Sequence, residues 1–203
     1  HPDNLDAVPL RDVLAHLRDQ EGWVDAVAVT GGEPTMHGEE LADLLRAIRE
    51  TDTDVILETN GTRPRELEEL IEAGLLDALS MDVKAPLEAR AYRRVTRREV
   101  EVDDVRTSIR HIISSGIEHE FRVTVVPGLV GREELKRMAP ELEGAQKVAL
   151  QNFQPELCMD RELRTVKPFM PDDMDELGET MEDAAERVVL RGRERGVSFA
   201  GGQ

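Results

Sequence analysis

The chain has 203 residues, 39% of them hydrophobic, which is enough for one domain with a sizeable core. Its acidic residues outnumber its basic ones by 43 to 26, and the formal net charge of −17 disfavours binding to nucleic-acid backbones. There is no apolar run of about 18 residues and no signal peptide, and a lone cysteine, Cys158, excludes an internal disulfide. We therefore expect a single cytoplasmic domain over residues 1–203, with neither nucleic acid nor a membrane as its partner.

Lysine is rare among the basic residues, and the sequence holds only Lys84, Lys136, Lys147 and Lys167. An acidic surface with few lysines is typical of a protein adapted to high salt, where repulsion between like charges is screened. An ordinary acidic protein from a GC-rich genome is the alternative interpretation. Either way, this feature concerns the source of the protein and not its reaction.

The first part of the chain alternates between amphipathic and continuously apolar segments. Leucine and isoleucine recur at helical spacing in the amphipathic segments, whereas the apolar segments are short and bounded by turn residues, as buried strands are. After a lead-in of residues 1–9, the predicted elements are helix 10–20, strand 24–30, helix 38–50, strand 54–59 and helix 63–73.

The same alternation continues through the second part of the chain. The predicted elements are strand 78–84, helix 104–115, strand 120–126, helix 133–139 and strand 147–153. Residues 87–103 are polar and rich in arginine, so we expect a loop with short helical pieces. Pro171 opens what we predict as a long final helix, over residues 171–195, and residues 197–200 as a short last strand.

Strands that are separated from one another by helices imply parallel βα units with right-handed crossovers. Five clear strands and a possible sixth are too few for a closed eight-stranded barrel. We therefore predict an α/β fold, an open partial (βα) barrel with parallel strands. In such a fold, a functional site lies where the carboxyl ends of the strands open into loops.

The first strand of this chain ends in a loop suited to a small cationic group, such as an amino-acid ammonium. Gly31 and Gly32 have no Cβ, so a ligand can approach the main chain closely. Glu33 places a carboxylate beside them, and Pro34 restricts φ in the turn that presents it. The loop does not resemble a phosphate cradle, because it lacks the lysine and the glycine spacing of that motif.

Polar residues also gather at the ends of the other four predicted strands, and five successive cases, with the first strand included, are hard to explain as ordinary loop composition. They are Glu58, Thr59, Asn60, Ser80, Asp82, Lys84, Arg122, Thr124, Gln151, Asn152 and Gln154. Asp82 and Lys84 point the same way, because side chains alternate along a strand. They either hold a carboxylate or hydroxyl of a ligand or form a salt bridge between neighbouring strands. Glu58, Thr59 and Asp82 also suggest an oxygen-rich cation site.

Five motifs in a fixed order carry a resemblance to a known family: T-G-G-E-P, E-T-N-G-T, M-D-V-K-A-P-L, T-V-V-P-G-L and L-Q-N-F-Q-P. Together they resemble the activating-enzyme branch of the radical S-adenosylmethionine (SAM) superfamily, and more closely the anaerobic ribonucleoside-triphosphate reductase activating proteins. The match runs from about Asp25 to Pro155. The resemblance implies a barrel that binds SAM and a [4Fe-4S] cluster, and an electron donor such as flavodoxin or ferredoxin.

In that family, reductive cleavage of SAM yields a 5′-deoxyadenosyl radical, which removes a hydrogen from a glycine of a partner glycyl-radical enzyme. By position, the resemblance implies that Gly31, Gly32, Glu33 and Pro34 hold the methionine amine of SAM. It places Thr59, Asn60, Asp82 and Lys84 on the SAM side of the barrel mouth. It places Asn152 and Gln154 near the adenosine. It assigns no catalytic residue and no metal ligand in this chain.

The sequence departs from the family in one important respect: the family's cluster loop, C-x-x-x-C-x-x-C, is absent. Three thiolates are needed to hold such a cluster, and Cys158 is alone. We expect that the chain begins just after that loop, lacks the family's first strand, and does not cleave SAM as given. The bare outer edge of strand 24–30 should then be covered by self-association or by the N-terminal helix.

Two other functions remain open at this point. One is a radical SAM enzyme that acts on a small molecule, similar to a 7-carboxy-7-deazaguanine synthase, which shares T-G-G-E-P and a similar E-T-N-G-T. The other is a non-catalytic binding module that has lost its cluster. The motifs M-D-V-K-A-P-L and V-V-P-G-L favour the activating enzyme over the first of these.

Overall fold

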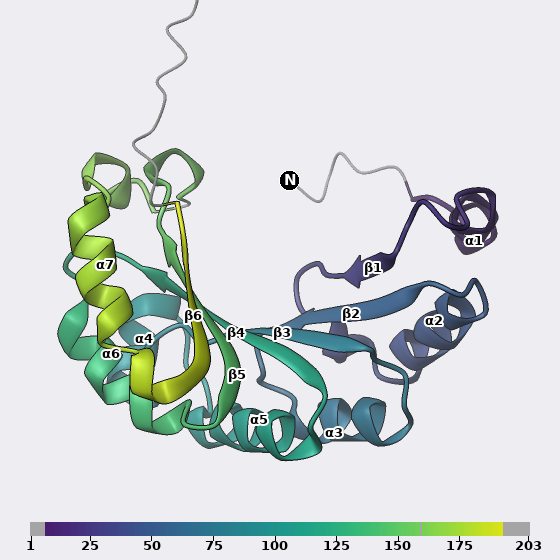
Figure 1. The fold of residues 1–203 in the computed structure, drawn as a ribbon, viewed down its shortest axis with the longest axis horizontal. Coiled ribbons are helices and arrows are strands. Elements are labelled where there is room, and N and C mark those ends of the chain that lie inside the picture. Colours follow the sequence, from purple (N-terminus) through teal and green to yellow (C-terminus); the bar gives the residue numbers. More distant parts are fainter. Residues whose placement is uncertain (1–6, 159, 193–203) are drawn as a thin grey trace, which may run out of the picture.

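The structure, a computed structural model, describes residues 7–158 and 160–192. Its six strands form one sheet in sequence order, and every neighbouring pair is parallel. They are β1 (Ala26–Val29), β2 (Asp54–Thr59), β3 (Ala78–Asp82), β4 (Glu118–Val125), β5 (Ala145–Asn152) and β6 (Ala185–Arg191). Among the described residues β1 pairs only with β2 and β6 only with β5, so the sheet is open (Figure 1). The predicted partial (βα) barrel is confirmed.

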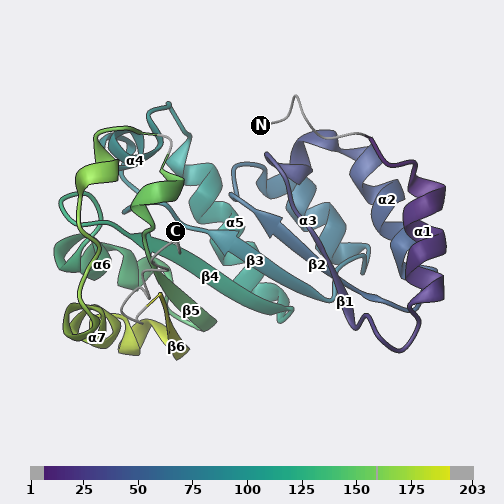
Figure 2. The same ribbon diagram turned by 90° about the horizontal axis from the view of Figure 1, so that it is seen from above.

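The helices lie along one face of this curved sheet and leave the other face open (Figures 1 and 2). They are α1 (Leu10–Asp19), α2 (Glu39–Arg49), α3 (Pro64–Glu72), α4 (Ala89–Thr96), α5 (Val102–Ser115), α6 (Arg132–Met138) and α7 (Pro171–Glu179). Up to β5, the observed bounds lie within about two residues of the predicted ones, apart from α4, which was predicted only as part of a loop. In the described part of the chain, no helix is long and apolar enough to cross a bilayer.

Alternation of side chains gives the sheet one apolar face and one polar face. The apolar side chains that pack against the helices are fully or almost fully buried, namely Val55, Leu57, Leu79, Met81, Phe121, Val123, Val125, Val148 and Leu150. The alternate positions carry polar or charged side chains, among them Glu58, Ser80, Asp82, Glu120, Arg122, Lys147, Gln151 and Arg191. The helix-covered face is therefore the core, and the open face is available for chemistry.

The predicted final helix over residues 171–195 is wrong. α7 ends at Glu179, and Ala185–Arg191 forms β6, which pairs in parallel with β5. The β-branched pair Val188 and Val189 suits a strand, and β6 occupies the free edge of β5. Gly178 allows α7 to lie close to this strand, because a Cβ there would be 3.2 Å from Cδ2 of Leu190. The predicted strand over residues 197–200 lies outside the described residues.

The arginine-rich segment contains one regular helix, α4, where a loop with short helical pieces was expected. Tyr92, which is 2% exposed, anchors α4 to the core. At the other side of the molecule, α1 lies next to α2 (Figure 2) and buries Leu17. Ala26 and Ala28 of β1 remain exposed, and cover of this edge by a second copy or by α1 stays a prediction.

Candidate active site

The structure brings the predicted cofactor-binding residues to one edge of the sheet, where the parallel strands end. Gly31, Gly32, Glu33 and Pro34 follow β1, Thr59 and Asn60 lie at the end of β2, Asp82 and Lys84 at the end of β3, and Asn152 and Gln154 at the end of β5. Because the strands are parallel and in register, these ends share one rim. The detailed contacts then divide the residues into three groups.

Glu33 ties the first loop to the second. Its Oε1 accepts hydrogen bonds from the Thr35 backbone N–H at 3.2 Å, from Thr35 Oγ1 at 2.6 Å and from Thr59 Oγ1 at 2.7 Å. Its Oε2 accepts from the Asn60 backbone N–H at 2.7 Å. The residue is only 8% exposed, so the carboxylate is a buried clasp between the ends of β1 and β2.

The clasp leaves the two glycines open. Gly31 and Gly32 are exposed, no atom lies within 4 Å of the position where a Cβ would stand on either, and Gly31 has a φ of +150° that favours glycine. Beside them lies a cavity with a volume of about 340 Å³, which Glu33, Pro34 and His37 also line. The loop therefore presents free main-chain atoms next to a buried negative charge.

The second β-strand end has a tight turn that needs glycine. Gly61 has a φ of +71°, and a Cβ there would lie 1.9 Å from Cε of Met81. Asn60 closes the turn, because its Oδ1 accepts hydrogen bonds from the N–H and the hydroxyl of Thr62 at 3.0 and 2.7 Å. The Asn-Gly pair thus has a structural role in addition to the role that the resemblance implies.

Arg122 of β4 joins three strands on the open face. Its Nη1 donates to Glu58 Oε1 at 2.7 Å and its Nε donates to Asp82 Oδ1 at 2.8 Å. Asp82 Oδ2 in turn accepts from Lys84 Nζ at 2.6 Å, and Glu58 Oε2 accepts from Thr30 Oγ1 at 3.0 Å. Of the two roles left open for Lys84, the structure has an ion pair with Asp82.

These contacts set the charge state of the group. The hydrogen bond from Arg122 is the main cause that holds the pKa of Glu58 below its ordinary value, against the effect of burial. Burial acts to lower the pKa of Arg122, but the hydrogen bonds and charges of Glu58 and Asp82 outweigh it and raise the pKa. Glu58 is therefore ionised beside the guanidinium, and Lys84 supplies a second cation to the pair of carboxylates. The suggested cation site of Glu58, Thr59 and Asp82 is not assembled in this structure, because Arg122 occupies the position between the two carboxylates and Thr59 donates to Glu33 instead.

From the sequence, Arg122 is predicted at a strand end, without a role. The missing information was the register, in which Arg122 stands opposite Asp82 on the neighbouring strand. A second ion-pair group was missed because β6 was predicted as a helix. There, Glu120 is 8% exposed and accepts from Arg191 at 2.8 Å, and Lys147 lies 3.4 Å from the same oxygen.

Asn152 and Gln154 border a separate cavity of about 480 Å³ at the ends of β4 to β6, together with Phe153, Cys158 and Arg191. The Asn152 amide fixes the loop that follows, since its Nδ2 donates to the Phe169 carbonyl at 2.8 Å and its Oδ1 accepts from the Phe169 N–H at 3.1 Å. Gln154 is exposed beside it. The predicted residues after β1 and those at the end of β5 thus border two separate cavities. Arg122 with its partners Glu58, Asp82 and Lys84, here called the Arg122 group, lies on the strands between them.

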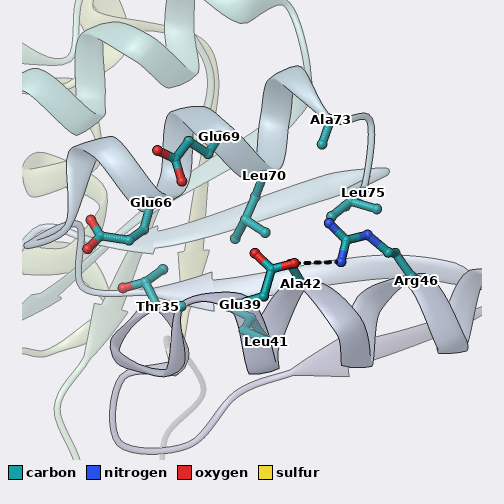
Figure 3. Close-up of a pocket in the computed structure, with 11 residues that line it drawn as sticks. Thr35, Glu39, Leu41, Ala42, Arg46, Glu66, Glu69, Leu70, Ala73 and Leu75 are labelled. Carbon is teal, nitrogen blue, oxygen red and sulfur yellow. Dashed lines mark hydrogen bonds and ion pairs between the residues drawn. The ribbon is translucent and has the colours of Figure 1, made fainter.

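A smaller cavity of about 180 Å³ lies between α2 and α3, within the helix layer (Figure 3). Its acidic residues already have partners: Glu39 accepts from Arg46 at 3.0 Å, as the dashed line in Figure 3 marks, and Glu69 accepts from Arg65 at 3.0 Å. Small residues such as Ala42 and Ala73 line the rest. This cavity is a gap in helix packing and not part of the rim.

A [4Fe-4S] cluster does not fit the residues of this chain. A cluster that binds SAM needs three protein thiolates, and the sequence has Cys158 alone. Cys158 lies in the loop after β5, where its thiol contacts the carbonyl of Gln154. No group of three His, Cys, Asp or Glu side chains takes the place of the thiolates among the described residues.

Two curated proteins are similar to this chain in sequence. The chain is 27% identical over 173 residues to a putative glycyl-radical enzyme activating enzyme of Methanocaldococcus jannaschii, which covers 83% of this chain and 71% of the relative. It is 29% identical over 145 residues to a 7-carboxy-7-deazaguanine synthase of Thermococcus kodakarensis, which covers 70% of this chain and about half, 54%, of that relative.

Two solved structures share the fold. One is a domain of pyruvate-formate lyase-activating enzyme from Bacteroides vulgatus, with a TM-score of 0.66 and 16% identity over 82% of this chain and 99% of that chain. The other is Streptococcus suis SuiB bound to S-adenosylmethionine, with a TM-score of 0.69 and 16% identity over 93% of this chain and 44% of that chain.

The family description "Radical SAM superfamily" matches residues 2–139, which is more than half of the sequence. The first of the relatives above confirms the resemblance to the activating enzymes of this superfamily. The matched range contains β1 to β4, with the Glu33 clasp and the Arg122 group. The chain therefore belongs to the radical SAM superfamily.

Proposed function

We propose that this chain binds SAM at the rim formed by the strand ends, and that it serves in the activation of a glycyl-radical enzyme. The observation that carries the proposal is the Glu33 clasp. It holds the exposed main chain of Gly31 and Gly32 against a buried carboxylate at the mouth of a radical SAM barrel. An ammonium group is favoured there by the negative charge and by carbonyl acceptors.

The other residues of the rim would position the rest of the ligand. Lys84 carries a half-exposed ammonium that suits the carboxylate of SAM, and Asp82 holds it in place at 2.6 Å. The cavity bordered by Asn152 and Gln154 offers the volume and the polar side chains for the adenosine. When bound, SAM supplies the adenosyl group from which enzymes of this superfamily generate a radical. The thiolates that would hold an iron–sulfur cluster are absent from this sequence.

The activating role is supported by the M. jannaschii relative, whose name is that of a glycyl-radical enzyme activating enzyme, and by motifs such as M-D-V-K-A-P-L. Within that role, we propose an anaerobic ribonucleotide reductase-like partner, a flavodoxin or ferredoxin as electron donor, and a cytoplasmic location. A second candidate is a small-molecule radical SAM reaction, which the likeness to a 7-carboxy-7-deazaguanine synthase favours.

Isothermal titration calorimetry with SAM tests the proposed site directly on the 203-residue chain. Both oxygens of Glu33 face a backbone N–H, so either orientation of a glutamine amide at this position sets a donor against a donor. Loss of the charge and of the loop geometry in Glu33→Gln should weaken SAM binding by about ten- to a hundredfold, since hydrogen bonds to charged groups contribute about 1.5–3 kcal/mol.

Glu72→Gln is the matched control, because Glu72 is an exposed residue at the end of α3. It should leave the affinity for SAM unchanged. Equal affinity of Glu33→Gln and the wild-type chain would remove Glu33 from the site, and absence of SAM binding by the wild-type chain would contradict the proposed cofactor. Co-elution with a purified anaerobic ribonucleotide reductase in gel filtration tests the partner separately.

A further inference from the structure

α4 and the residues that follow it form a concentrated basic segment in an otherwise acidic protein. Residues 89–98 contain five arginines and no acidic residue, although the chain has a formal net charge of −17. All five side chains belong to exposed residues, and we call them the arginine rim: Arg90, Arg93, Arg94, Arg97 and Arg98. A local excess of positive charge of this size needs an explanation other than the average composition.

The arginine rim lies at the mouth of the barrel. α4 begins seven residues after β3 ends, and two of the five arginines reach the loops that follow the next two strands. Arg94 donates to the carbonyl of Gly128, just after β4, and Arg97 pairs with Asp160 at 3.1 Å in the segment after β5. Figure 2 shows α4 beside the loops that follow β5. Through Arg94 and Arg97, this basic segment therefore lies at the same edge of the sheet as the proposed SAM site.

The core holds α4 in a fixed orientation. Tyr92 is buried, and its hydroxyl accepts a hydrogen bond from the Lys84 backbone N–H at 3.2 Å, which ties the helix to the end of β3. Val95 packs partly against the core from the same helix. Because these residues face inward, the arginines of α4 face outward, and the charge is displayed by a rigid element.

Internal pairing does not account for the whole rim. Arg93 pairs with Glu99 and Arg97 with Asp160, but within the described ranges Arg90 and Arg98 form no salt bridge. The helix dipole does not account for it either. A cation near the amino end of a helix is unfavourable, and Arg90 lies in the first turn of α4. Arg90 and Arg98 are thus charges available to a partner.

We propose that the arginine rim docks an acidic surface of the protein substrate, beside the mouth through which that substrate must reach bound SAM. This rests on the proposed function. A protein substrate has to cover the mouth of the barrel for its glycine to approach bound SAM, so it lies against the arginine rim. An electron donor does not have to cover the mouth. The complementary charge would orient the encounter and suppress wrong docking poses.

The charge distribution favours an acidic protein patch over a nucleic acid. An extended polyanion would continue past α4 onto a surface that is acidic overall, where it would be repelled. A compact group of carboxylates can lie entirely against the arginine rim. At physiological salt, charges more than about 8 Å apart are largely screened, so the acidic surface elsewhere on the protein repels these carboxylates only weakly.

Fluorescence anisotropy provides the test, with a short labelled peptide in which glutamates flank a central glycine. The 203-residue chain should bind this peptide at low salt and lose it at about 1 M salt, where screening is strong. The double variant Arg90→Glu and Arg98→Glu should bind it at least about tenfold more weakly, because two unpaired cations become anions. The matched control is the double variant Arg11→Glu and Arg65→Glu. Both residues are exposed on other parts of the surface, and these substitutions change the net charge by the same amount.

Four results would overturn the proposal: no peptide binding by the wild-type chain, an equal loss in the control variant, tighter rim-dependent binding of a single-stranded oligonucleotide, or tighter rim-dependent binding of a purified flavodoxin. Calorimetry with SAM separates this inference from the proposed function. The rim variant should bind SAM as the wild type does. If the wild type binds the peptide but not SAM, the proposed cofactor is wrong while the acidic specificity of the rim stands.

Discussion

Replacing Arg122 with methionine removes the cation that joins Glu58 to Asp82 while keeping most of the side-chain volume. The guanidinium is 17% exposed, and it donates to Glu58 at 2.7 and 3.3 Å and to Asp82 at 2.8 Å. Its loss leaves two carboxylates, each slightly over a quarter exposed, on one face of the sheet.

The expected cost follows from this burial. Removing one partner of a buried ion pair costs about 3–5 kcal/mol, and hydrogen bonds to charged groups contribute about 1.5–3 kcal/mol each. Water can reach both carboxylates, and Lys84 still pairs with Asp82, so the cost should fall below the buried limit. We expect Arg122→Met to lower the free energy of unfolding by about 2–4 kcal/mol at pH 7.

The cost should also depend on pH, with a sign set by Glu58. Its pKa is lower in the folded protein than in the unfolded chain, so its stabilising effect is present above the unfolded pKa of about 4.5. That effect is lost as the pH falls through the folded pKa. The difference in stability between the wild type and Arg122→Met should therefore narrow on acidification below about pH 4.5.

Urea denaturation followed by circular dichroism, at pH 7 and at successively lower pH, measures both effects. Arg65→Met is the control, because Arg65 pairs with Glu69 on the surface and their side chains are 84% and 61% exposed. Such a pair should contribute less than about 0.5 kcal/mol. A cost for Arg122→Met that matches this control, or that stays constant with pH, would refute the role assigned to the Arg122 group.

Three further predictions follow from the packing. Gly61→Ala should lower the free energy of unfolding by about 2–4 kcal/mol, because the added Cβ would overlap buried Met81. Gly74→Ala, with open space around it, should lower it by only about 1 kcal/mol, and urea denaturation compares the two variants. Asn152→Leu leaves both backbone groups of Phe169 without their partner, so limited proteolysis should cut the loop after β5 faster. Burial raises the pKa of Tyr92 to about 12, so stability should fall as the pH rises from about 10 to 12, and less so in Tyr92→Phe.

Much of the architecture could be predicted from the sequence because its signals are local. Short apolar runs that end in glycine or proline identified β1 to β5, and leucine and isoleucine at helical spacing identified the helices between them. The T-G-G-E-P loop after β1 could also be recognised, since its residues are consecutive. Alternation along β3 correctly placed Asp82 and Lys84 on one side.

The rest depended on contacts between segments far apart in the chain. Ala185–Arg191 is a strand because the free edge of β5 offers it hydrogen-bond partners, and within the segment itself helix and strand patterns compete. Only a ligand role was predicted for the carboxylate of Glu33, and the fold also brings Thr59 and Asn60, more than 25 residues later, into hydrogen-bonding distance of it.

Arg122 shows the same limit most clearly. Its partners Asp82 and Glu58 lie 40 and 64 residues earlier, and only the register of β2, β3 and β4 brings the three side chains onto one face. A sequence specifies which side chains share a face of a strand, because that follows from the geometry of one chain segment. Which charges meet across strands depends on the register of the strands. That register is fixed by the pairing of the whole sheet and by the packing of its core, so no single segment of sequence determines it.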